Sequence, residues 1–71
     1  MKAFVAVSKT ELGNNPGLGT SLSAICSSVE DSDDVFKFHP KEGELMNLIC
    51  ILLDKEVVYR LNLNSAPVEE N

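Results

Sequence analysis

The chain has 71 residues and a formal net charge of −5; 44% of its residues are hydrophobic and 24% are charged. This length limits it to one small domain that buries only about 60% of the unfolded chain's surface, and the composition excludes a chain that is disordered throughout. The six basic residues are dispersed along an acidic chain, which argues against direct binding of nucleic acid.

The first predicted element is a strand over residues 3–7, an apolar and β-prone run (AFVAV). This run is too short for the core of a signal peptide, and the longest apolar run, residues 48–53, is too short to span a membrane. Cys26 and Cys50 lie inside apolar runs and are expected to be buried thiols, with a bridge between them as the alternative. These features predict a protein of the reducing cytoplasm.

Residues 8–19 are predicted to form a loop, because polar residues, glycines and a proline gather there. A helix is predicted from about residue 20 to 30, with Thr20 or Ser21 as its N-cap. The carboxylates of residues 30–34 (EDSDD) are expected to end this helix, since they oppose its macrodipole. The helical prediction depends on the spacing of five apolar residues, Leu18, Leu22, Ile25, Cys26 and Val29.

Two further strands are predicted from alternation of apolar and polar residues, one over residues 35–39 and one over residues 57–63. Pro40 closes the first of them. The segment between them, residues 44–54, has two interpretations. A helix with one broad apolar face is favoured, and a strand that forms a hairpin with residues 57–63 is the alternative.

These elements predict an α+β fold, with a small, mainly antiparallel sheet of three or four strands and one or two helices packed on one face. Residues 1–64 are expected to form a single compact domain. Residues 65–71 (SAPVEEN) are interpreted as an acidic C-terminal tail.

The glycine-rich sequence GNNPGLGTS has the layout of a phosphate-binding loop, because it follows a predicted strand and leads into a predicted helix. It resembles the P-loop at Gly19 and Ser21, but Thr20 stands where the lysine belongs and Asn14 where the first glycine belongs. Without that cation we do not predict a nucleotide-hydrolysing enzyme. A capped helix start is the preferred interpretation. A weak anion-binding or nucleotide-binding module is the alternative, through backbone N–H groups of Gly17, Gly19, Thr20 and Ser21.

Neither a metal site nor a catalytic site is predicted. The acidic run lacks the glycine of a calcium-binding loop, and His39 is the only histidine, so no histidine pair exists. A cysteine–histidine nucleophilic pair would need an exposed thiol, whereas both cysteines are expected to be buried. We therefore expect a protein that is not an enzyme and that needs no cofactor.

The function predicted from these features is a small acidic module that binds a basic surface of another protein, such as an accessory or inhibitory factor of phage or mobile-element type. Eight of the nine residues from Leu45 to Leu53 are apolar, which indicates a protein interface or a homodimer contact as well as a core element. A structural homo-oligomer is a further alternative. The predicted partner-binding residues are Glu30, Asp31, Asp33, Asp34 and Tyr59.

Overall fold

A computed structural model describes residues 2–64 of the chain. The elements are β1 (Lys2–Ser8), α1 (Lys9–Asn14), α2 (Leu18–Ala24), β2 (Cys26–Ser32), β3 (Val35–Pro40), α3 (Leu45–Asp54) and β4 (Tyr59–Asn64). The predicted α+β class is confirmed, with three helices rather than one or two. The predicted acidic tail lies outside the described residues.

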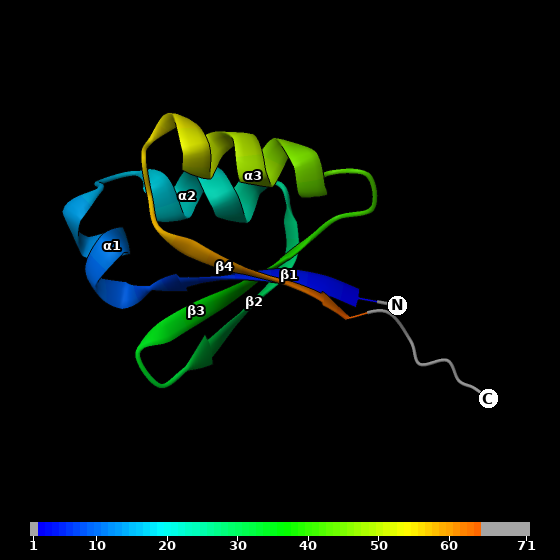
Figure 1. Ribbon diagram of the computed structural model, residues 1–71, viewed down its shortest axis with the longest axis horizontal. Helices are drawn as coiled ribbons and strands as arrows, with labels where there is room; N and C mark the ends of the chain where they lie inside the picture. Colours follow the sequence, from blue (N-terminus) through cyan, green and yellow to red (C-terminus); the bar gives the residue numbers. More distant parts are fainter. Residues whose placement is uncertain (1, 65–71) are drawn as a thin grey trace.

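The four strands form one sheet in the order β2-β3-β1-β4, and every neighbouring pair is antiparallel. Each helical segment therefore connects two parallel strands that are separated by a third strand, which is the split β-α-β arrangement called ferredoxin-like. Figure 1 shows α2 and α3 over one face of the sheet and α1 near one end of it. No helix of the described part of the chain covers the other face, and β2 and β4 are the two edge strands.

The core lies between the sheet and helices α2 and α3. Val5 and Val7 are fully buried on β1, and the register places Val5 opposite Phe38 of β3, so the three side chains share the helix-covered face. Burying each such side chain stabilises the fold by about 1.5–3 kcal/mol. The other buried side chains are Leu18 and Leu22 of α2, Cys26 of β2, Leu48 and Leu52 of α3, and Val57.

The predictions for β1, β3 and β4 are confirmed to within a few residues. The open question over residues 44–54 is resolved as a helix, α3, and the hairpin alternative is wrong. Leu48 and Leu52, four residues apart, are both fully buried on the same face of this helix. A strand would have pointed apolar side chains to both faces of the sheet, and none of the described helices covers the second face.

The prediction of a loop over residues 8–19 is wrong, because residues 9–14 form the short helix α1. Ser8 is its N-cap, and the Ser8 hydroxyl accepts a hydrogen bond from the Glu11 backbone N–H at 3.0 Å. Ser8 and Glu11 have the S-x-x-E spacing of a capping box, which marks a helix start in the sequence. The glycine and proline content of the following residues obscured this pattern.

The prediction of one helix over residues 20–30 is also wrong. Helix α2 begins at Leu18 and ends at Ala24, and residues 26–32 form β2. The N-cap is Gly17, in the left-handed conformation, rather than Thr20 or Ser21, which lie inside the helix. Serine is only a middling helix former, so pairing of this serine-rich segment with β3 outweighs the helical spacing of its apolar residues.

The prediction that residues 30–34 end a helix is wrong. They form the end of β2 and the turn into β3. Asp33 has a backbone φ of 51°, in the left-handed region that aspartate tolerates better than most residues. The acidic run is therefore a hairpin turn at one end of the sheet. Below, the acidic hairpin means Glu30, Asp31, Asp33 and Asp34.

Candidate protein-interaction surface

Helix α3 has two apolar faces. One packs into the core through Leu48 and Leu52, which are fully buried. The other consists of residues 46, 49, 50 and 53, whose i, i+3, i+4, i+7 spacing places them on one stripe. Met46 is 67% exposed and Leu53 is 60% exposed, so this second stripe lies outside the core. A single helix needs only one apolar face to join a core, so the second face exceeds what the core of residues 2–64 requires.

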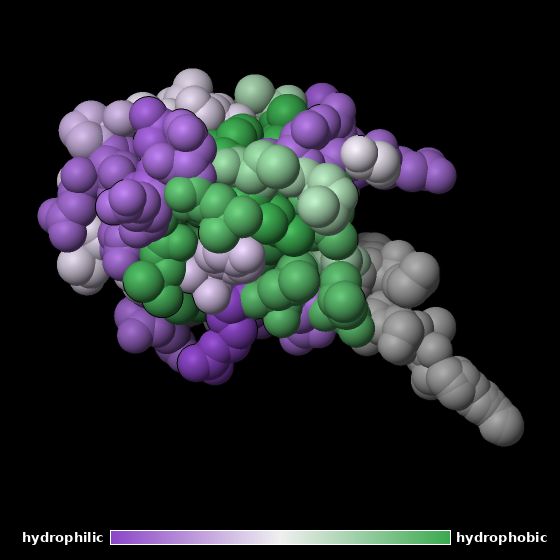
Figure 2. Space-filling model, turned by 45° about the horizontal axis from the view of Figure 1, so that its top comes forward, coloured by the Kyte–Doolittle hydropathy of each residue, from purple (hydrophilic) through white to green (hydrophobic). Residues whose placement is uncertain are grey.

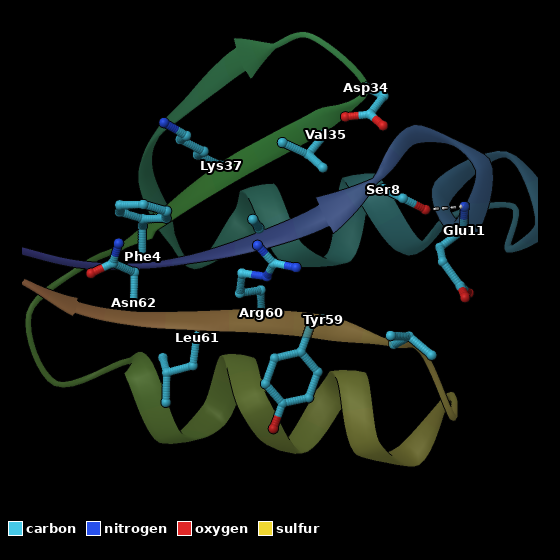
Figure 3. Close-up of a pocket in the computed structure, with 12 residues that line it drawn as sticks. Phe4, Ser8, Glu11, Asp34, Val35, Lys37, Tyr59, Arg60, Leu61 and Asn62 are labelled. Carbon is cyan, nitrogen blue, oxygen red and sulfur yellow. Dashed lines mark hydrogen bonds between the residues drawn. The ribbon is translucent and has the colours of Figure 1, made fainter.

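Strand β4 adds further exposed apolar side chains at the edge of the sheet. Leu61 and Leu63 are 39% and 62% exposed. They lie opposite Val5 and Ala3 of β1, on the same side of the sheet as the helices. Figure 3 shows Tyr59 and Leu61 extending from β4 toward α3. Because β4 is the last strand in the order, its outer backbone edge has no neighbouring strand among residues 2–64.

The exposed stripe of α3 and the exposed leucines of β4 belong to one side of the molecule. Figure 2 shows apolar side chains gathered over this side, with hydrophilic residues around them. We call this region the α3–β4 surface and define it by Met46, Ile49, Leu53, Leu61 and Leu63. Contiguous exposed apolar patches of this kind mark interaction sites in soluble proteins.

The acidic hairpin lies on the opposite edge of the sheet. The Glu30 carboxylate lies 3.3 Å from His39 Nε2, and the Asp31 carboxylate forms an ion pair with Lys9 at 2.7 Å. Both pairs are partly exposed, so each contributes little to stability. Asp33 and Asp34 are exposed at the turn. Glu30 and Asp31 are consecutive residues of β2, so their side chains point to opposite faces of the sheet.

Tyr59, the fifth predicted partner-binding residue, does not join the acidic hairpin. Tyr59 lies opposite Val7 of β1, Val7 lies opposite Phe36 of β3, and Phe36 lies opposite Asp31 of β2. The tyrosine and the carboxylate are therefore separated by the full width of the sheet, roughly 14 Å at 4.8 Å per strand. Tyr59 is half-buried and packs against the core beside the α3–β4 surface.

The residues predicted as a weak anion site begin helix α2. The Leu18 N–H donates to the Asn15 carbonyl at 3.0 Å, and the Ser21 N–H donates to the Gly17 carbonyl at 3.0 Å. Two of the N–H groups in this segment are thus already used within the chain. No lysine or arginine occurs between Lys9 and Lys37 in the sequence. This turn adds no side-chain cation to the backbone groups of Gly19 and Thr20.

A cavity of about 720 Å³ opens over the face of the sheet that the helices leave uncovered, at the β4 side. Figure 3 shows its lining. The Phe4 ring lies 5.2 Å from Lys37 Nζ and 5.3 Å from the His39 ring, measured to the centroid of Phe4. The lining holds two basic side chains, Lys37 and Arg60, and two carboxylates, Glu11 and Asp34. It therefore has no excess charge of either sign.

Both cysteines are free thiols. Cys26 is buried as predicted, and burial raises the pKa of its thiol, an effect that the nearby Lys41 charge partly offsets. Cys50 is exposed on the outer stripe of α3, so the prediction that it is buried is wrong. The reason is that α3 carries more apolar residues than the core accommodates.

Within residues 2–64, no three side chains of ligand type form a group suited to a metal ion. None of the helices in this part of the chain has both the length and the apolar character needed to cross a membrane. No known family model, curated protein or solved structure matches the chain.

The sequence shows the excess of apolar residues over 45–53 but not which of them are exposed. The sequence-based prediction did not group three residues of the α3–β4 surface, which are Met46, Leu53 and Leu63. Their i, i+7 spacing on the helix and their alternation on the strand were visible in the sequence. Their position at one edge depends on β4 being an edge strand, which follows only from the topology.

Proposed function

We propose that the protein is a non-catalytic protein-binding module that uses the α3–β4 surface as its contact region. The observation that carries this proposal is the second apolar stripe of α3, where Met46 and Leu53 are more exposed than a core requires. Burial of apolar area in an interface stabilises a complex by about 25 cal/mol per Å². A small domain has little other surface that can contribute binding free energy.

The acidic hairpin has a different role in this proposal. It lies across the sheet from the α3–β4 surface, so it does not extend the apolar contact. Its carboxylates and the net charge of −5 instead attract a second partner, a protein with a basic surface, at long range and accelerate that encounter. An accessory or inhibitory factor of the phage or mobile-element type is consistent with this size and charge.

Affinity capture from a native lysate tests the proposal. Tagged wild-type protein is compared with a Met46→Glu, Leu53→Glu double variant, whose new charges disrupt an apolar contact without entering the core. The matched control is Val29→Glu, because Val29 is 41% exposed on the other edge strand. We expect the double variant to lose captured proteins that wild type and the control retain. Identical capture by all three proteins would contradict the proposal.

A further inference from the structure

The two edge strands differ in how well they are protected against pairing with another strand. Every β2 residue between Ser27 and Ser32 except Val29 is polar or charged, and the β2–β3 register is interrupted between Cys26 and Ser28. Charges and irregular register are the usual devices that stop an edge strand from pairing. Strand β4 has neither device, because its register with β1 is continuous and Arg60 is its only charged residue.

The sequence of β4 is complementary to itself in one antiparallel register. If Leu61 of one copy lies opposite Leu61 of a second copy, then Tyr59 lies opposite Leu63, and Arg60 lies opposite Asn62. All pairs on the helix-covered side are then apolar or aromatic. The pair on the uncovered side joins a guanidinium donor to an amide that can accept from it.

The two neighbouring registers that keep the helices on the same side are less favourable. A register centred on Arg60 places two arginines directly opposite each other, which is destabilising. A register centred on Asn62 pairs Leu61 with Leu63 but moves Tyr59 beyond the described strand of the second copy. Only the register centred on Leu61 pairs the aromatic ring and also keeps like charges apart.

We propose that a second copy of this chain occupies the β4 edge, with a twofold axis at Leu61, so that two four-stranded sheets join into one. This inference rests on the proposed function, because it names the partner of the α3–β4 surface. A two-stranded contact alone is only marginally stable in water, so the outer stripe of α3 adds apolar area on the same side of the joined sheet. The acidic hairpins then lie at its two far ends, where mutual repulsion is least.

Sedimentation velocity over a concentration series tests whether the second copy binds. We expect wild-type protein to be a dimer that dissociates on dilution, and Leu61→Asp to weaken the association at least about tenfold by placing two carboxylates opposite each other. Val29→Asp is the control, since Val29 and Leu61 are 41% and 39% exposed on the two edge strands. Circular dichroism confirms that both variants fold. A wild-type protein that remains monomeric, or a control that is equally weakened, would overturn the inference.

Cysteine cross-linking tests the register independently of any destabilising charge. Leu61→Cys, Arg60→Cys and Asn62→Cys are each made in a Cys50→Ser background, because Cys50 is exposed and Cys26 is buried. In the proposed register the two residues 61 lie about 5 Å apart between Cα atoms, within disulfide reach. The residues 60, and likewise the residues 62, lie about 8 Å apart, beyond it.

Under mild oxidation we expect Leu61→Cys to form covalent dimers about a hundredfold faster than random collision at ~10 µM allows, since a preformed pair has a millimolar effective concentration. The other two variants should link only at the collision rate. Preferential linking of Asn62→Cys or Arg60→Cys would overturn the register. Two results together would overturn the dimer but leave the proposed function standing. These are a wild-type protein that is monomeric, and a Met46→Glu, Leu53→Glu variant that still loses the proteins captured by wild type.

Discussion

Gly17 and Gly19 lie two positions apart but have opposite backbone requirements. Gly17 has a φ of +86° as the N-cap of α2, a conformation that residues with a Cβ adopt only with strain. Gly19 lies within the helix, where glycine is a poor helix former. Apart from the neighbouring backbone, a Cβ added at either position has no atom within 4 Å. Backbone conformation alone therefore decides the effect of a substitution.

We expect Gly17→Ala to lower the free energy of unfolding by about 1 kcal/mol, because of the left-handed conformation. Gly19→Ala should raise it by about 0.5–1 kcal/mol, because alanine replaces glycine in a helix. Urea titration of both variants measures the two values, and each variant serves as the control for the other. If both changes had the same sign, the assignment of Gly17 as the helix cap would be wrong.

At the scale of the element, α3 has one buried face and one exposed face, and the proposed function assigns stability to the first and binding to the second. Leu48→Ala removes a fully buried side chain and should lower the free energy of unfolding by about 2–5 kcal/mol. Met46→Ala alters a side chain that is 67% exposed, and it should change that free energy by less than about 0.5 kcal/mol. Thermal unfolding of dilute protein measures both. Comparable losses for the two variants would mean that Met46 belongs to the core.

The elements also show what the sequence could and could not predict. Strands β1, β3 and β4 and helix α3 follow from local apolar patterns, which their burial confirms. Helix α1 was predictable from the S-x-x-E spacing of Ser8 and Glu11, although the nearby glycines concealed it. Strand β2 was not predictable, because its apolar residues have helical spacing. Its structure depends on pairing with β3, which the local sequence pattern of residues 26–32 does not reveal.

The candidate site was predicted only in part for a similar reason. The excess of apolar residues over 45–53 indicated an interface from composition alone. The sequence predicts both Tyr59 and the acidic hairpin as partner-binding residues, whereas the strand order places the two at opposite edges of the sheet. Long-range topology decides which residues share a surface, and a single sequence contains little information about it.

At the scale of the whole molecule, the sheet has one edge that resists pairing and one that permits it. The β2 edge carries the acidic hairpin, and the β4 edge carries exposed leucines and a backbone that pairs with no outer strand among residues 2–64. The proposed association through β4 uses one side of the molecule only, which would limit growth to a closed twofold dimer and prevent fibres. The acidic ends of that dimer then remain accessible to a basic partner.

Amide hydrogen exchange over a concentration series compares the two edges within one sample, so that global unfolding affects both equally. In a dimer joined at β4, the amides of residues 60–63 that point away from β1, which are every second one, should exchange at least about tenfold more slowly as the protein concentration rises. Amides of residues 28–31 in β2 should not change. Exchange in β4 that is independent of concentration, or protection that rises equally in β2, would show that the β4 edge is not the interface.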